Sequence, residues 1–282
     1  MRLSAIVPVY NPLRHLEKVL ESLRCQTVQV DEIVVTDDGS EEDVLGALRS
    51  WRHALPFPVI FVRQPRRGSR RAKCRNNGIR LASGDRLFFL DQDIVFTRRY
   101  LETFRNYRSE RVFLVGYPIR LSEEQSAGLT LEMIRSGEQR NVLDARQRRK
   151  LRSAHAQELW TYSLRPLIPS IGYHPKLRSG VFGLHRRHLE QVNGFDENYE
   201  GWGNEDDDLG RRLYQIGIRG RNIFRAEFPL HLYHPMTEAR EDRVNREYYR
   251  RRIHEIVRGE SAAPRGLRNS AGSEELQVVR LD

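Results

Sequence analysis

The sequence has few cysteines and no long apolar run. Its two cysteines, Cys25 and Cys74, have neither paired nor metal-type spacing, so no disulfide framework is implied and reduced structural thiols are expected. No apolar stretch approaches the roughly 18 residues that span a bilayer, and the run after Met1 is shorter than a signal peptide. We therefore expect a cytoplasmic protein.

Lysine is also scarce, because the chain contains only Lys18, Lys73, Lys150 and Lys176, although its formal net charge is +10. Nearly all the basic charge is therefore arginine, which binds phosphate and carboxylate groups in a planar, bidentate manner. The charge indicates anionic partners, such as nucleic acid, an acidic membrane surface or acidic sugars, without choosing among them. For most of the arginines we favour a compositional bias that leaves them solvated.

Apolar runs alternate with helical patterns in the first third of the chain, which predicts βα units and a largely parallel sheet. The length suits one mixed α/β domain. A helix is expected from Pro12, capped by Asn11, then one capped by Ser40, and one that ends near Ala82. The expected strands are residues 3–9, 32–36, 59–63, 86–90 and 112–117.

The pattern becomes polar and arginine-rich between about residues 121 and 177, where we predict a helical insertion on the acceptor side. A strand is expected at 179–184 and a helix from Glu205. After about Gly259 the chain is rich in serine, alanine, proline and glycine, which predicts a poorly ordered tail.

Three of the expected strands end in polar residues, and the carboxyl ends of parallel strands meet in one crevice. Asp91 and Asp93 are two residues apart, a spacing that can direct both carboxylates to the same side of an extended chain. Two oxygen ligands with open positions suit Mg²⁺ or Mn²⁺ on a diphosphate, although the same pair also occurs by chance in acidic turns. The strand-end residues are Pro8, Val9, Tyr10, Asp37, Asp38, Asp91, Gln92 and Asp93.

Four segments in the first hundred residues resemble glycosyltransferase family two, which has the GT-A fold. They are residues 6–11 (IVPVYN), 34–40 (VVTDDGS), 74–79 (CRNNGI) and 88–93 (FFLDQD). The resemblance implies a single α/β domain with a Rossmann-like, mostly parallel central sheet flanked by helices. It also implies a nucleotide-sugar donor, usually uridine-linked.

In this resemblance Asp38 accepts the N–H of the base, and the backbone around Pro8, Val9 and Tyr10 lines the nucleotide. Arg75 matches the basic position near the diphosphate, although a solvated helix arginine is a rival interpretation. Asp91 and Gln92 complete the expected nucleotide site.

A second signal lies at residues 201–208, GWGNEDDD. Asp207 and Asp208 have arginines four residues later, at 211 and 212, which is a stabilising arrangement on a helix surface. Glu205 and Asp206 face Leu209 and Gly210 instead, so they are better explained by a role outside the helix. The alternative is a helix start in which Asn204 is the cap and the acidic residues complement the helix dipole.

This segment resembles the Trp-Gly-x-Glu-Asp motif of β-1,4-galactosyltransferases and of bacterial chondroitin-polymerase type enzymes. The resemblance implies that Asp206 is the catalytic base and that Glu205 binds acceptor hydroxyls, beside Gly203. Trp202 either stacks on an acceptor sugar or is a core aromatic. The aspartate at this position favours inversion of the anomeric carbon.

Residues 229–235 place two imidazoles downstream of the expected base, and related enzymes take a histidine metal ligand from this region. We prefer His234, with His231 second, to complete a metal site with Asp91 and Asp93. The expected cofactor is Mn²⁺ or Mg²⁺.

Together these features predict a metal-dependent inverting hexosyltransferase of polysaccharide biosynthesis that moves sugar, usually from UDP, to a glycan or lipid-linked glycan. Residues 1–120 would bind the nucleotide-sugar, 121–258 would bind the acceptor and carry catalysis, and 259–282 would form a flexible tail. The basic surface could also contact the inner face of a membrane peripherally.

Three alternatives remain. A nucleotidyltransferase could use the same strands and metal, but it offers no reason for residues 202–206. A nucleic-acid-binding protein is disfavoured because the arginine clusters at 64–75 and 135–152 carry few aromatics. An inactive sugar-binding relic is disfavoured by the intact Asp93 and Asp206.

Overall fold

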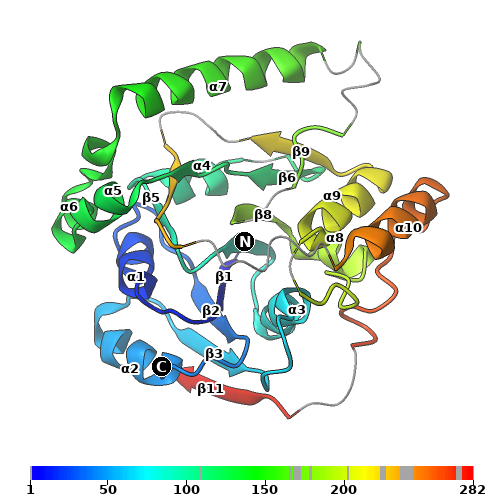
Figure 1. Ribbon diagram of the computed structural model, residues 1–282, viewed down its shortest axis with the longest axis horizontal. Helices are drawn as coiled ribbons and strands as arrows, with labels where there is room; N and C mark the ends of the chain where they lie inside the picture. Colours follow the sequence, from blue (N-terminus) through cyan, green and yellow to red (C-terminus); the bar gives the residue numbers. More distant parts are fainter. Residues whose placement is uncertain are drawn as a thin grey trace.

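The computed structural model describes residues 2–107, 109–164, 167, 173–177, 180–201, 203–222, 227–235, 244–270 and 275–281. Its main feature is a sheet with the strand order β11-β3-β2-β1-β4-β8-β6-β9 (Figure 1). Strands β3, β2, β1 and β4 are mutually parallel, whereas β8 is antiparallel to both β4 and β6. The strands are β1 (Leu3–Val9), β2 (Glu32–Asp37), β3 (Val59–Arg63), β4 (Arg86–Leu90), β6 (Val112–Val115), β8 (Val181–His185), β9 (Arg219–Asn222) and β11 (Gln277–Leu281).

Both faces of the parallel strands are buried under helices. In β1 the alternation of side chains directs Leu3, Ala5, Val7 and Val9 into one core and Ile6 into the other. The first core is covered by α1 (Leu16–Arg24), α2 (Val44–Trp51) and α4 (Tyr100–Arg105), and the second by α3 (Arg71–Leu81), α8 (Arg186–Gln191) and α9 (Glu205–Gln215). This double covering explains why the strands read as continuous apolar runs.

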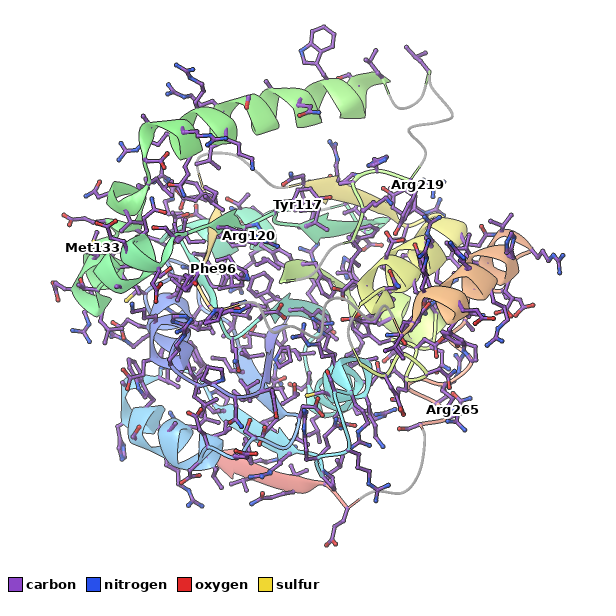
Figure 2. The ribbon with its side chains drawn as sticks, in the orientation of Figure 1. Phe96, Tyr117, Arg120, Met133, Arg219 and Arg265 are labelled. Atoms are coloured by element: carbon purple, nitrogen blue, oxygen red, sulfur yellow. The ribbon has the colours of Figure 1, made fainter. Side chains whose placement is uncertain are left out.

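A smaller sheet with the order β5-β10-β7 lies beside the main one and comprises β5 (Ile94–Phe96), β10 (Pro229–His231) and β7 (Ile119–Arg120). It forms a third core with α6 (Leu131–Ser136) and with Leu121 and Leu129, which flank α5 (Glu123–Gly128). Phe96 lies inside the molecule, whereas Met133 of α6 lies at its margin (Figure 2). Two 3-10 helices, η1 (Arg52–Ala54) and η2 (Gln139–Val142), and the long helices α7 (Ala145–Leu164) and α10 (Arg246–Val257) complete the described elements.

The predicted α/β architecture and most of its elements are confirmed. The strands expected at 3–9, 59–63 and 86–90 have these bounds, whereas 32–36 extends to Asp37, 112–117 ends at Val115, and 179–184 becomes Val181–His185. The helix expected from Glu205 and the helical character of 121–177 are also confirmed.

Two predicted helix starts are wrong. The first helix begins at Leu16 rather than Pro12, because polar contacts hold residues 11–13 as a loop: the Leu13 N–H donates to the Glu42 carboxylate, and the Asn11 side chain accepts from the Glu42 N–H. The second helix is capped not by Ser40 but by Asp43, whose carboxylate accepts the Gly46 N–H at 2.8 Å.

The predicted flexible tail is wrong for the described residues after Gly259. Strand β11 pairs antiparallel with β3 from Gln277 to Leu281 and closes that edge of the sheet. Earlier in the tail, the Ala263 N–H donates to the Val192 carbonyl at 2.9 Å and the Leu267 N–H to the Asn193 carbonyl at 3.0 Å. The tail is ordered because β11 pairs with the unpaired backbone N–H and C=O groups of β3. Composition alone does not reveal this pairing.

Candidate active site

The loops that follow β1, β2 and β4 converge at one edge of the main sheet, as predicted. The Gln92 side chain accepts the Tyr10 N–H at 2.8 Å and donates to the Tyr10 carbonyl, which joins the ends of β1 and β4. The Asp38 N–H donates to the Val9 carbonyl at 3.1 Å, which adds the end of β2. Chain connectivity reverses between β1 and β4, so this edge is a topological switch point, where ligands bind in open α/β sheets.

Arg75 of α3 is the central cation of this edge. Its side chain is 1% exposed and its guanidinium contacts Asp91 Oδ1 at 3.2 Å, Glu205 Oε1 at 3.3 Å and Asp206 Oδ1 at 3.1 Å. Burial alone would lower the pKa of Arg75, but the three carboxylates raise it above its usual value. Arg75 already links the end of β4 to the start of α9. The three carboxylates therefore compete with the predicted diphosphate for its guanidinium.

Asp206 lies in the first turn of α9 and is buried beside Arg75. Burial is the main cause that raises the pKa of Asp206 to about 7; Glu205 and Asp91 add to it, while Arg75 and Arg71 oppose it. A carboxylate with this pKa can exchange a proton near neutral pH.

The rest of the first turn of α9 agrees with the expected pairing. Asp207 contacts Arg211 at 3.0 Å and Asp208 contacts Arg212 at 2.6 Å. Asn204 has a left-handed backbone, with φ of 76°, and its side chain does not cap the helix. The simple capping explanation of this segment therefore fails for Asn204.

Asp93, His231 and His234 form the candidate metal centre. The pairing of His231 with Ile94 sets β10 beside β5, and the Nε2 atoms of His231 and His234 lie 3.6 and 3.3 Å from Asp93 Oδ2. One ligand atom from each of the three residues lies within 4.8 Å of the others. Both imidazoles expected as alternatives therefore reach the same carboxylate.

The donor set of this cluster fits a divalent cation. Burial raises the pKa of Asp93, but the hydrogen bond from His234 and the charges of His231 and His234 outweigh it and hold the pKa below its usual value. Asp93 Oδ1 is buried and has no hydrogen-bond partner among the described residues. A buried acceptor of this kind needs a partner, and carboxylate with imidazole suits Mn²⁺. Asp91 contacts Arg75 instead, and its role as a metal ligand stays a prediction.

Asp38 and Tyr10 are joined through the basic loop that follows β3. Asp38 accepts from Gln64 Nε2 at 2.6 Å and from the Arg70 N–H at 2.9 Å, and burial raises its pKa. The Arg66 guanidinium lies 4.0 Å from the centre of the Tyr10 ring and 3.5 Å from Asp38. Sequence reasoning missed Gln64, Arg66 and Arg70 as site residues, although the run of charge in this loop was a signal.

Pro8 and Val9 belong to β1, and Val9 is buried in the core, so its side chain is not available to a nucleotide. Gly203, with φ of 100°, requires a glycine-type backbone at the start of α9, and its carbonyl accepts from Asn245 Nδ2 at 3.2 Å. Trp202, predicted on the acceptor side, lies outside the described residues.

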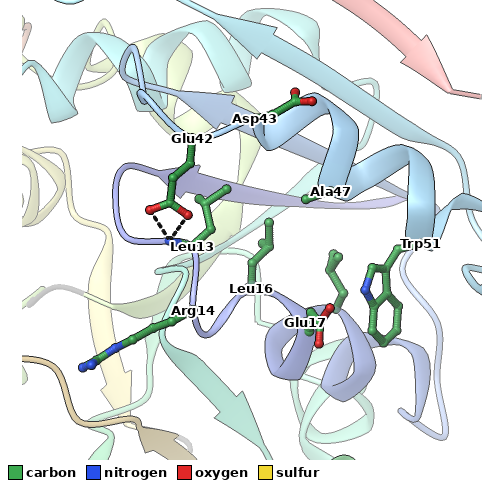
Figure 3. Close-up of a pocket in the computed structure, with 9 residues that line it drawn as sticks. Leu13, Arg14, Leu16, Glu17, Glu42, Asp43, Ala47 and Trp51 are labelled. Atoms are coloured by element: carbon green, nitrogen blue, oxygen red, sulfur yellow. Dashed lines mark hydrogen bonds between the residues drawn. The ribbon is translucent and has the colours of Figure 1, made fainter.

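A separate cavity of about 460 Å³ lies between α1 and α2 (Figure 3). The Glu42 carboxylate closes one side of it by accepting the Leu13 N–H. None of the candidate active-site residues lines this cavity, so it is not part of the site described here. Its lining residues are Leu13, Arg14, Leu16, Glu17, Leu20, Glu42, Asp43, Ala47 and Trp51.

Two family models match the sequence. The model for glycosyl transferase family 2 matches residues 4–159, more than half of the chain, and the model for the N-terminal domain of galactosyltransferase matches residues 169–235.

Two curated relatives illustrate the similarity. The validoxylamine A glucosyltransferase of Streptomyces hygroscopicus subsp. jinggangensis is 30% identical over 77% of this chain and 52% of its own length. The chondroitin synthase of Escherichia coli is 25% identical over 86% of this chain and 36% of its own length. The chain thus spans about half or less of these relatives.

Solved structures show the same fold. S. aureus TarS in complex with UDP-GlcNAc matches with a TM-score of 0.62 and 18% identity, covering 91% of this chain and 65% of that one. The mannosyltransferase of Pyrobaculum calidifontis in complex with GDP-Man and Mn²⁺ matches with a TM-score of 0.59 and 19% identity, covering 93% and 66%. The predicted GT-A fold is confirmed.

Proposed function

The chain belongs to glycosyl transferase family 2, and on that basis we propose that it is a metal-dependent, inverting glycosyltransferase. It transfers a sugar from a nucleotide diphosphate donor to a hydroxyl of a glycan or lipid-linked glycan. The observation that carries the proposal is the buried carboxylate of Asp206, which lies 3.1 Å from Arg75 in the same cluster as Asp91 at the end of β4. The proposed base is thus linked through Arg75 to the carboxyl end of β4, where we propose that the donor binds.

The donor binds at the crevice formed by the ends of β1, β2 and β4. A uridine nucleotide is favoured by Asp38, whose position matches the base-binding aspartate of the family, and by the likeness to a TarS structure that holds UDP-GlcNAc. Tyr10, with the Arg66 guanidinium 4.0 Å from its ring, provides a flat, cationic wall for the nucleotide. Gln92 acts indirectly, since its amide holds the backbone of Tyr10.

Asp206 acts as the general base. An acceptor hydroxyl becomes a sufficient nucleophile when a positioned carboxylate removes its proton as the new bond to the anomeric carbon forms. A pKa of about 7 leaves Asp206 basic enough to accept that proton at neutral pH. Arg75 fixes the orientation of Asp206 and Glu205, and Glu205 accepts hydrogen bonds from acceptor hydroxyls.

Attack by a hydroxyl from the side opposite the nucleotide inverts the anomeric configuration. This single displacement therefore needs one base and no protein nucleophile. Glycans as acceptors are supported by the similarity to an E. coli chondroitin synthase.

Asp93, His231 and His234 would hold a Mn²⁺ or Mg²⁺ ion. When bound, such an ion neutralises the negative charge that develops on the departing diphosphate. The short antiparallel pairing of β5 with β10 keeps the three side chains together.

The test is nucleotide release and sugar transfer from a panel of nucleotide-sugars, with Mn²⁺ or with a chelator. We expect metal-dependent release from one donor, lost in Asp93→Ala. Asp206→Asn should still bind the donor but should transfer sugar about 10²–10⁴-fold more slowly, which is the usual contribution of a general base.

The matched control is Asp207→Asn, which removes the same charge from the neighbouring residue of the helix turn and should keep transfer above that of Asp206→Asn. Absence of turnover and of metal-assisted nucleotide binding, from a folded native chain, would refute the proposal. Full activity of Asp206→Asn would refute only the assignment of the base.

A further inference from the structure

Helix α7 stands apart from the two sheets and runs along the edge of the molecule (Figure 1). Its first turns are attached: Asp144 accepts the Gln147 N–H at 2.6 Å, and Gln147 Nε2 donates to the Arg120 carbonyl at 3.1 Å. Among the described side chains of the helix, Leu151 is the last that packs on a core cluster. The described side chains of the helix that follow Leu151 are exposed.

The outer face of α7 is exposed along its length. Residues three or four apart share a face of a helix, and the exposed residues at such spacings start at Arg146 and end at Leu164. Trp160 is 68% exposed, which is unusual for so large an apolar side chain. The residues of this outer face are Arg146, Arg149, Lys150, Ser153, Gln157, Trp160 and Leu164, all exposed.

The apolar end of this face continues past the helix. The Leu167 N–H donates to the Leu164 carbonyl at 2.9 Å, which holds Leu167 close to the last helical turn. Leu167 is 75% exposed and Leu164 is 37% exposed. With Trp160 they form what we call the apolar tip.

The other end of α7 is strongly cationic. Residues 145–153 contain five basic side chains and no acidic one. None of the five forms an ion pair with a residue that the structure describes. We call them the basic end; they are Arg146, Arg148, Arg149, Lys150 and Arg152.

We propose that α7 docks on an anionic lipid bilayer. Arg146, Arg149 and Lys150, the members of the basic end on the outer face, bind anionic headgroups, and the apolar tip enters the interfacial layer, where tryptophan is favoured. Charge complementarity selects this partner, because a second copy of the chain would carry the same formal charge of +10. Single-stranded nucleic acid is disfavoured, since it is bound by aromatics interleaved with basic residues, whereas α7 separates the two kinds.

The chain leads from the apolar tip to the helix that carries the proposed base. Tyr173 follows the apolar tip by six residues, and its hydroxyl donates to the Asp207 carbonyl at 2.8 Å, directly beside Asp206 in α9. The bilayer proposal itself depends only on α7 and can be tested without any assay of sugar transfer.

The experiment is co-sedimentation of the full chain with vesicles of phosphatidylcholine alone or mixed equally with phosphatidylglycerol. We expect binding to the mixed vesicles only, weakened by added salt. The triple variant Arg146→Gln/Arg149→Gln/Lys150→Gln should bind about a hundredfold more weakly, at about fivefold for each basic residue. The double variant Trp160→Ser/Leu167→Ser should bind at least about tenfold more weakly.

Matched controls remove the same groups elsewhere on the surface. Arg49→Gln/Arg105→Gln/Arg111→Gln removes equal charge from exposed positions, and Val257→Ser removes an apolar side chain that is 73% exposed on α10. Both should bind like the native chain. Leu167 lies beyond the end of α7. The single variant Leu167→Ser therefore tests the apolar tip without depending on the folding of α7.

Three results would overturn the proposal. The first is equal binding of the native chain to neutral and mixed vesicles, or none to either. The second is an equal loss in the remote arginine variant, which would show a general charge effect. The third is a native dimer that dissociates in the Trp160→Ser/Leu167→Ser variant without loss of vesicle binding, which would show that the apolar tip joins two copies.

Discussion

Arg75 holds together two segments that are far apart in the chain, the end of β4 and the first turn of α9. Its removal would leave three carboxylates, two of them buried, without their common cation. Breaking a buried ion pair in this way costs about 3–5 kcal/mol. We expect Arg75→Ala to lower the free energy of unfolding by that amount, measured by urea denaturation.

The matched control is Arg66→Ala, since the Arg66 side chain is 40% exposed and its ion pair with Asp38 is longer. That change should lower the free energy of unfolding by less than about 1 kcal/mol. Equal losses in the two variants would contradict the role of Arg75 as the central cation.

The pKa of Asp206 predicts how the transfer rate depends on pH. Burial raises this pKa to about 7, so the carboxyl is mostly protonated below pH 7 and cannot act as a base. The rate should therefore rise about tenfold per pH unit below 7 and level off above it. Arg75→Lys, which keeps the charge but loses the planar guanidinium, should move this rise to higher pH.

Steady-state kinetics from pH 5 to about 9 would measure the profile, with urea unfolding at each pH to exclude denaturation. Asp206→Asn should lose the rise below pH 7 as well as most of the rate. If Asp206→Asn kept the pH profile of the native chain, the titrating group would be another residue.

Some site residues could be predicted from sequence and others could not. Glu205 and Asp206 have no helical partner at i+4, and the structure shows that both contact a residue outside α9, Arg75. Arg75 itself was ambiguous, because a guanidinium suits phosphate and carboxylate equally. Gln64 was missed because a lone amide in a loop carries no pattern.

At the level of secondary structure elements, α9 is fixed from behind by α10. Arg252 of α10 is 1% exposed, and its Nε lies 3.7 Å from both Asp196 and Asp208, the latter on the helix that carries Asp206. We expect Arg252→Met to lower the free energy of unfolding by about 3–5 kcal/mol, because the buried carboxylate of Asp196 loses the cation 3.7 Å away, while Asp208 keeps its pair with Arg212. Thermal and urea unfolding would measure it.

The adjacent residue provides the control for this prediction. Arg251 is 67% exposed and lies 3.8 Å from Glu255, so Arg251→Met should change stability by less than about 0.5 kcal/mol. A stable Arg252→Met variant would show that packing rather than charge holds α10 against α9.

Long elements were predictable and short ones were not. Strands β1, β3 and β4 appear as continuous apolar runs, whereas β5, β7 and β10 have only two or three residues and no detectable period. The metal-centre geometry depends on these short strands. The sequence therefore indicated His231 and His234 only through resemblance to a family.

For the whole molecule, a bound metal should add stability that grows with the logarithm of its concentration. A ligand at a hundred times its Kd stabilises the folded chain by about 2.7 kcal/mol, so Mn²⁺ should raise the Tm by several degrees. A chelator should reverse the shift, and Asp93→Ala should abolish it. The readout is thermal unfolding and needs no substrate.

The control for metal binding is His254→Ala, which removes an exposed imidazole on α10 that is not a member of the cluster. Its Tm shift with Mn²⁺ should equal that of the native chain. An unchanged shift in Asp93→Ala would place the ion elsewhere.

Net charge was readable from composition, but its placement was not. The value of +10 indicated an anionic partner and the sequence showed the arginine cluster at 135–152, whereas the structure shows that five of its basic side chains belong to the first turns of one long helix, α7. Among the described residues, no helix is both long and apolar enough to cross a membrane.

The position of β8 has a consequence for synthesis on the ribosome. This strand lies between β4 and β6 in the sheet, although it follows β4 by about ninety residues in the chain. At about 5–20 residues per second, the nascent chain spends about 5–20 s with β4 made and its neighbour not yet translated. During that interval the unpaired backbone edge of β4 can pair with another nascent chain, so slow or paused translation of residues 91–180 should lower the yield of folded protein.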